Sequence, residues 1–249
     1  MKNDSLHINR AVVLFSLSPN KESAAKKITD VKRNNSAILK SLFNHTLEII
    51  QTVQLQTNFD FIISSSNIST IKNYKYIEQK GNNFNERIRS TVSSVFKLGY
   101  DEVIIVGNDC PNLSPELIEH SFNSLVSNDV VVGPSSDGGF YLLALKKNDE
   151  NIYKHVRWYS GKVLSQLLDN IIKLNFTFVL LPELNDIDDY ADLIELLKNC
   201  NFTNQQFYLQ LKKLLIVYQL FISIYSIKFI SYESYRTIWQ KPPPVILPL

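Results

Sequence analysis

The stretch VIIVGNDCP, at residues 103–111, decides the fold. Its four consecutive β-branched apolar residues, with no alternating polar position, predict a strand buried on both faces, as in a parallel sheet. Gly107 permits a close backbone approach at the end of this strand, and Pro111 stiffens the turn beyond it. Ligands of open α/β sheets bind at the carboxyl ends of strands, so Asp109 is expected to project into a binding crevice.

Further strands and helices alternate on both sides of this stretch. Short runs rich in β-branched and aromatic residues predict strands, and apolar residues at helical spacing predict helices. The predicted strands are 11–15, 59–64, 103–106, 130–132, 140–145 and 176–181. The predicted helices are 36–51, 84–98, one that begins near Ser114, and 186–197, and residues 18–22 are predicted to form a loop. The alternation predicts an α/β fold whose mostly parallel sheet is flanked by helices on both faces.

Composition narrows the class of protein. The chain has 249 residues, of which 45% are hydrophobic and 20% charged, and its net charge is +2, as in ordinary globular proteins. The lysines are scattered and form no basic stripe, so a nucleic-acid partner is not expected. Cys110 and Cys200 have neither disulfide-framework nor zinc-site spacing. A reducing, cytoplasmic location is therefore expected, since the N-terminus also lacks a convincing signal peptide.

The chain is expected to divide into a catalytic domain, residues 1–200, and an apolar extension, residues 201–249. Residues 214–230 are apolar but include Gln219 and Lys228, which makes them too short and too polar for a firm membrane span. They are expected to pack on the domain or on a second subunit, so the extension could form a homodimer interface. Binding to a membrane surface is the alternative.

Three acidic turns carry the candidate chemistry, and the first is Asp109. A carboxylate on a rigid strand end suits a Mg²⁺ or Mn²⁺ ion that also holds substrate phosphates. The alternative is that Asp109 only caps the helix that follows.

The second acidic turn is GPSSDGGF at residues 133–140. Gly138 and Gly139 beside Asp137 allow a tight turn whose N–H groups can face an anion or a sugar hydroxyl. The alternative is an ordinary hairpin turn, which Asp-Gly strongly favours.

The third acidic turn is NDIDD at residues 185–189, where alternation places two carboxylates on the same side of an extended segment. They would suit a shared metal, or Asp186 or Asp188 could simply cap the following helix. If the three turns meet at one crevice, their carboxylates repel each other, and a divalent cation would relieve that repulsion.

Taken in order, GNDCPNL, GPSSDGGFYLLAL and DIDDYADL resemble the DUF2064 family of predicted glycosyltransferases. The segments QKGNNFNER at 79–87 and RWYS at 157–160 support the resemblance, which covers about residues 10–197. It implies the GT-A fold of nucleotide-diphospho-sugar transferases, a divalent cation on Asp109, and a position for Asp188 near the metal or the reacting centre. It also implies that Asp137, Gly138 and Gly139 line the donor or acceptor pocket.

The remaining substrate-binding candidates are Gly107, Asn108, Arg87 and Trp158. Arg87 could instead lie on a solvated helix face, and Trp158 could be a packing residue. The sequence departs from the family at residues 18–27, which lack the glycine and the Lys-Thr-Arg of the phosphate-binding loop, although Lys21 or Lys26 could still reach phosphates.

These observations predict metal-dependent transfer of a glycosyl group from a nucleotide-diphosphate sugar to an unidentified acceptor. Asp137 or Asp188 would act as base for the acceptor hydroxyl. The first alternative is a nucleotidyltransferase that releases pyrophosphate, which the altered loop disfavours. The second is a binding protein of the same fold without catalysis.

Overall fold

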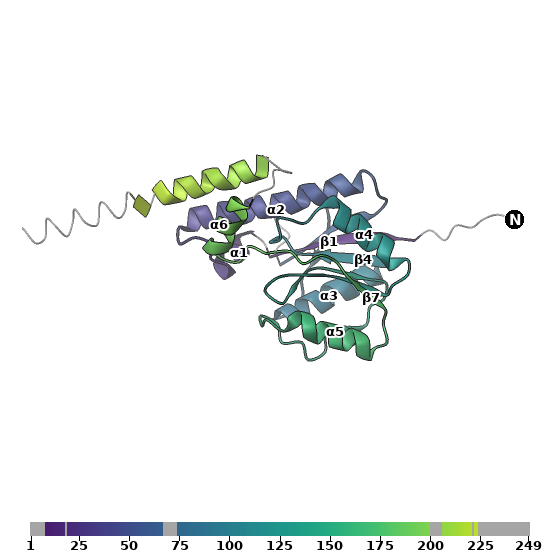
Figure 1. Cartoon of the computed structure of the whole chain (residues 1–249). Helices are drawn as coiled ribbons and strands as arrows, with labels where there is room; N and C mark the ends of the chain where they lie inside the picture. The colour runs from purple at the N-terminus through teal and green to yellow at the C-terminus, as the bar shows by residue number, and fades with distance from the viewer. Residues whose placement is uncertain (1–7, 18, 67–73, 200–205, 221, 224–249) are drawn as a thin grey trace, which may run out of the picture. The chain divides into compact units, whose positions relative to one another are not determined.

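The strands β1 (Arg10–Phe15) and β4 (Glu102–Val106) lie side by side near the middle of the sheet. The computed structural model describes residues 8–17, 19–66, 74–199, 206–220 and 222–223. Within these ranges the strands form a seven-stranded sheet in the order β3-β2-β1-β4-β6-β5-β7. Figure 1 marks β1, β4 and β7 in this sheet. The other strands are β2 (Asp60–Ser65), β3 (Lys75–Glu78), β5 (Val130–Pro134), β6 (Phe140–Leu145) and β7 (Phe178–Leu180). Only β6 runs antiparallel to its neighbours in this sheet.

The predicted fold class is confirmed, and the two faces of the central strands explain it. Val12 and Leu14 of β1 face one apolar cluster, and Ala11 and Val13 face the other, all without exposed surface. A strand buried on both faces needs an unbroken apolar run, which is why the β-branched stretches were readable as strands.

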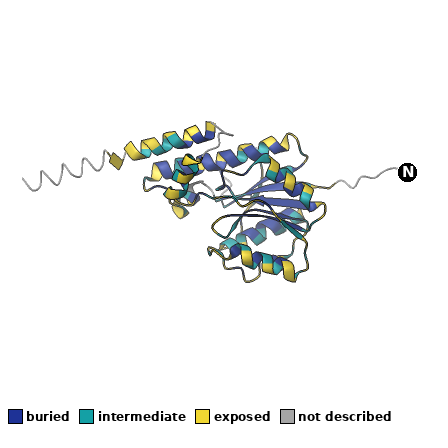
Figure 2. Ribbon diagram, viewed as in Figure 1, coloured by how far each residue is buried: buried dark blue, intermediate teal, exposed yellow. Residues whose placement is uncertain are grey.

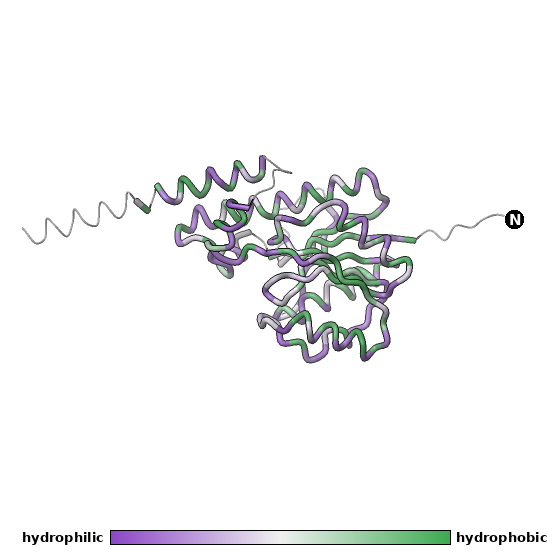
Figure 3. Tube along the Cα trace, viewed as in Figure 1, coloured by the Kyte–Doolittle hydropathy of each residue, from purple (hydrophilic) through white to green (hydrophobic). Residues whose placement is uncertain are grey.

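Helices cover each face of the sheet. The helices α2 (Lys32–Gln54) and α4 (Pro115–Leu125) pack on one face, and α3 (Phe84–Lys97) and α5 (Val163–Lys173) pack on the other. Figure 2 shows that the helix sides that face the sheet are buried. Figure 3 shows that the strands between the helices are mostly hydrophobic. Ser114 precedes α4 as predicted, and Gly99, with a φ of 90°, follows the end of α3.

Two sequence predictions need correction, and three elements were not predicted. The predicted loop 18–22 was wrong, because residues 19–25 form the helix α1 (Pro19–Ala25). The strand β3, the helix α5 and the short 3-10 helix η1 (Glu150–Tyr153) were not predicted. The helix predicted at 186–197 is α6 (Tyr190–Lys198), which begins four residues later. Its N-cap is Asp189, which forms a capping box with Asp192, so neither Asp186 nor Asp188 caps it.

The chain divides into two compact units, Met1–Cys200 and Asn201–Leu249. In the second unit, residues 206–220 are helical, while 221, 224–230 and the Pro-rich end lie outside the described residues. Among the helices that the structure describes, none is long and apolar enough to cross a membrane. The homodimer through residues 201–249 stays a prediction.

Candidate functional site

The candidate site lies where the strand order reverses. The chain leaves β1 toward β2 and β3 on one side, and β4 begins the other half of the sheet, so the carboxyl ends of β1 and β4 flank a topological switch point. Two adjoining cavities lie there, of about 380 Å³ and about 230 Å³. Both are lined by Asp109 and Asp188, together with Phe84 and Tyr159, so these residues mark the junction of the two cavities.

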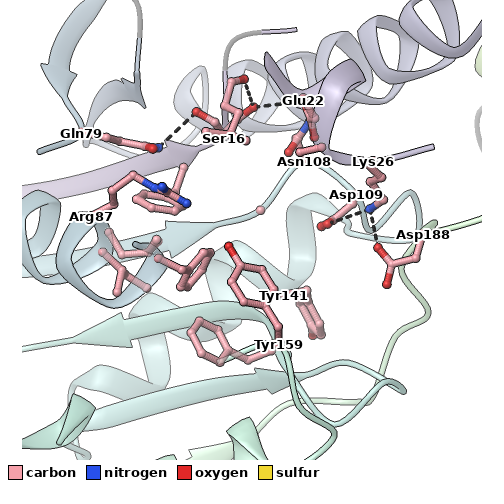
Figure 4. Close-up of a pocket in the computed structure, with 18 residues that line it drawn as sticks. Ser16, Glu22, Lys26, Gln79, Arg87, Asn108, Asp109, Tyr141, Tyr159 and Asp188 are labelled. Carbon is pink, nitrogen blue, oxygen red and sulfur yellow. Dashed lines mark hydrogen bonds and ion pairs between the residues drawn. The ribbon is translucent and has the colours of Figure 1, made fainter. Parts of the chain in front are cut away.

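At the junction a lysine joins two of the predicted acids. Lys26 Nζ lies 3.1 Å from Asp109 Oδ2 and 2.6 Å from Asp188 Oδ1 (Figure 4). Burial of this ammonium acts to lower its pKa, but the charges and hydrogen bonds of the two carboxylates outweigh burial, and the pKa of Lys26 is raised overall. Lys26 therefore stays charged and offsets part of the repulsion between the acids.

Three carboxylates form a second group at the smaller cavity. One oxygen from each of Asp137, Asp186 and Asp188 lies within 4.8 Å of the others. Burial, followed by the charges of Asp137 and Asp188, raises the pKa of Asp186 to about 7. Sequence reasoning considered Asp186 only as a helix cap or as one of two alternating acids, whereas the fold places it inside the group.

Local hydrogen bonds hold these carboxylates in place. Asp137 Oδ1 accepts from Ser135 Oγ at 2.5 Å and from the Gly139 N–H at 2.7 Å, which closes the turn after β5. The Ile187 N–H donates to the Asp109 carbonyl at 2.9 Å, and so ties the third acidic turn to the first. Because Asp189 caps α6, Asp186 and Asp188 keep their carboxylates directed at the cavities.

Glu22 is a residue that sequence reasoning missed. Asn108 Nδ2 donates to both of its carboxylate oxygens, at 2.9 and 3.1 Å, and Glu22 is only 8% exposed. Burial raises the pKa of Glu22 to about 7, against the lowering effect of the Asn108 hydrogen bond. The missed signal is helical spacing in 19–26, which brings Glu22 and Lys26 to the same side of the chain.

Aromatic side chains form another wall. Trp158 packs against Phe84 with ring centroids 4.6 Å apart, and Tyr159 contacts Phe84 edge to face at 5.9 Å. Trp158 is therefore a packing residue, as the alternative interpretation predicts, and it also lines the smaller cavity.

The other predicted residues fall into three places. Gly107, Asn108 and Arg87 line the larger cavity, and Gly139 lines the smaller one. Gly138 has a φ of 85° and lies against the backbone of Gly161, so packing gives a sufficient reason for this glycine. The substrate-binding role of these residues stays a prediction.

Family comparison matches part of this site. The sequence pattern of the family described as "Uncharacterized protein conserved in bacteria (DUF2064)" matches residues 51–160. The resemblance to DUF2064 is thereby confirmed. The match includes the turns of Asp109 and Asp137, whereas Glu22, Lys26 and the third acidic turn lie outside it. None of the curated proteins matches the chain.

Solved structures share the fold. A "putative nucleotide-diphospho-sugar transferase" from Desulfovibrio desulfuricans superposes with a TM-score of 0.74 at 20% identity, over 86% of this chain and 98% of that one. A CMP-2-keto-3-deoxy-manno-octonic acid synthetase complexed with CTP has a TM-score of 0.48 at 9% identity, over 76% and 96%. A Mycobacterium tuberculosis protein complexed with manganese has a TM-score of 0.45 at 12% identity, over 77% and 100%. The first comparison supports the predicted fold class, a mostly parallel sheet flanked by helices.

Proposed function

We propose that the protein transfers a glycosyl group from a nucleotide-diphosphate sugar to a hydroxyl acceptor, with the help of a divalent cation. The observation that carries the proposal is the meeting of Asp109, Asp188 and Lys26 at the junction of two cavities at the topological switch point. A transferase needs a site for each of two substrates, with charged groups at the point where they meet.

The two cavities differ in charge. The larger cavity contains Arg87 and Lys26, whose donors suit a diphosphate, beside the acids Glu22, Asp109 and Asp188. The smaller cavity contains Asp137, Asp186 and Asp188, whose oxygens suit the hydroxyl groups of an acceptor and can take up its proton. In this assignment the donor is held in the larger cavity, and Asp137 or Asp188 is the base, through the carboxylate oxygen that it does not offer to the cation.

The cation fits the cluster of three carboxylates at the smaller cavity. Hard divalent cations take oxygen ligands, and Asp137, Asp186 and Asp188 offer three oxygens close together. Burial and then repulsion from Asp137 and Asp188 raise the pKa of Asp186, and a cation at this position would relieve the repulsion. When bound, Mg²⁺ or Mn²⁺ would neutralise negative charge that develops on the departing diphosphate. The Asp109 assignment of the metal is thereby extended to this trio, with Asp188 common to both sets.

A nucleotidyltransferase is the second candidate, and Lys26 is the observation that favours it. Such a reaction needs a positively charged side chain from the segment after β1. Lys26 reaches the acids from that segment although the loop motif is missing. Release of pyrophosphate from a nucleoside triphosphate in the presence of Mn²⁺ would favour this reaction over glycosyl transfer. A chain that bound nucleotide sugars and turned over neither substrate class would be a binding protein.

Titration calorimetry with nucleotide sugars tests the proposal. We expect Mn²⁺ to strengthen the binding of at least one of UDP-glucose, ADP-glucose, dTDP-glucose and GDP-mannose. The substitution Asp186→Asn should weaken that Mn²⁺-dependent gain about tenfold, because one ligand oxygen of the trio is lost. Asp169→Asn, on the exposed side of α5, is the matched control and should change nothing. Equal donor affinity with and without Mn²⁺ in the wild type would contradict the role of the cation.

A further inference from the structure

Tyr159 combines features that a packing residue rarely has. Its side chain is 84% exposed, yet it lines both cavities at their junction. Its φ is 59°, in the left-handed region, which a bulky aromatic residue adopts only at a cost in free energy. Such conformations persist where the surrounding structure imposes them, and they gather at ligand-binding sites.

The neighbours of Tyr159 hold the residue without covering its ring. Its described aromatic contact is with Phe84, at a centroid distance of 5.9 Å and an interplanar angle of 74°. An edge-to-face contact fixes the orientation of the pair but leaves most of the tyrosine surface free, in agreement with its exposure. The strained backbone therefore presents a flat apolar surface to the cleft rather than to the core.

The position of the ring relative to the charged groups defines what it can contact. In Figure 4, Tyr159 lies across the larger cavity from Glu22 and Asn108, with Arg87 on one side and Asp109 and Asp188 on the other. A diphosphate held by Arg87 and Lys26 would place the group attached to it at the junction of the cavities. Tyr159 lines that junction, so the attached group is in its reach.

We propose that Tyr159 stacks on the sugar ring of the nucleotide-diphosphate donor and so selects the donor over the free nucleotide diphosphate. This inference rests on the proposed function, since it concerns the same donor. The C–H face of a sugar ring is apolar and matches a flat aromatic surface, while its hydroxyl groups remain directed at Asp109 and Asp188.

The experiment compares Tyr159→Gly and Tyr159→Phe with the wild type by calorimetry in Mn²⁺. The ligands are UDP-glucose, ADP-glucose, dTDP-glucose and GDP-mannose, each beside its parent diphosphate. Tyr159→Gly should weaken the binding of the preferred nucleotide sugar about tenfold and leave binding of the parent diphosphate unchanged, while Tyr159→Phe should keep both. The melting temperature of Tyr159→Gly should not fall, because glycine accepts a φ of 59° without strain. His155→Gly, at an exposed residue with a φ of 60°, controls for the backbone change.

The outcomes separate this proposal from the function on which it rests. An equal loss of affinity for sugar nucleotide and diphosphate would overturn the proposal and place the ring on the nucleobase. Unchanged affinities in Tyr159→Gly would overturn it and leave the glycosyl transferase function intact. A wild type that binds neither ligand class would overturn both.

Discussion

As the pH rises from 4.5 to 7, titration of Glu22 should lower the free energy of unfolding of the wild type by about 3 kcal/mol, and Glu22→Gln should abolish this loss. The pKa of Glu22 is raised from 4.5 in the unfolded chain to about 7 in the folded protein. Between these values the folded state keeps the proton and the unfolded state has released it. The free energy of unfolding therefore falls with rising pH through this window, and is constant below 4.5 and above 7 as far as Glu22 is concerned.

Glutamine is a close mimic of the protonated acid. Its amide has one oxygen that can accept from Asn108 Nδ2, as the neutral carboxyl does, and it has no charge to desolvate. Urea unfolding at pH 5 and pH 8 gives the two free energies for each protein. Glu48→Gln, an exposed residue of α2, is the control and should follow the wild type.

The comparison with the wild type matters because Asp186 titrates in the same range. Its pKa is also raised to about 7, so Glu22→Gln will retain a pH dependence from the carboxylate group. The prediction concerns the difference between the two proteins. If Glu22→Gln and the wild type lost the same stability between pH 5 and pH 8, the carboxyl of Glu22 would have to be solvated in the folded protein, contrary to its burial.

The parts of the fold that could be read from the sequence are those that local physics determines. Strands β1 and β4 are buried on both faces, so their composition alone identifies them. The edge strand β3 is only partly buried and reads Lys-Tyr-Ile-Glu, a pattern that polar loops share. The spacing of Val163, Leu167 and Ile171 could have predicted α5, since all three are buried on one side of that helix.

The site was predictable in its outline and not in its partners. Carboxyl ends of strands share one edge of a sheet, so the convergence of Asp137 and Asp188 follows from the topology. The contact of Lys26 with Asp109 joins residues 83 positions apart, and no local pattern specifies which acid a lysine at the end of the helix α1 will reach. Which acid caps α6 was likewise undecided, because three aspartates compete within four residues and only the hydrogen bonds of Asp189 settle the cap.

Gly138→Ala is expected to destabilise the protein by about 3 kcal/mol, the sum of a conformational cost and a steric overlap. The φ of Gly138 is 85°, which alanine adopts with strain, and a Cβ there would lie 2.4 Å from the carbonyl oxygen of Gly161. That oxygen belongs to the backbone, so relief requires the loop or the turn to move. Gly99→Ala is a matched control because Gly99 has a φ of 90° but no atom within 4 Å of the added methyl group.

The control isolates the part of the effect that bears on the site. Gly99→Ala should cost only about 1 kcal/mol in urea unfolding, since it adds strain without overlap. The excess destabilisation by Gly138→Ala measures how tightly the turn of Asp137 is packed. This turn is also tied to the start of α5, because the Gly138 carbonyl accepts from the Leu164 N–H at 2.8 Å. Moving this turn should displace Asp137 from Asp186 and Asp188, so the Mn²⁺-dependent gain in donor binding should fall in Gly138→Ala and persist in Gly99→Ala. Equal destabilisation by the two substitutions would mean that the turn moves easily. The backbone of the turn would then not hold Asp137 rigidly against the other two carboxylates.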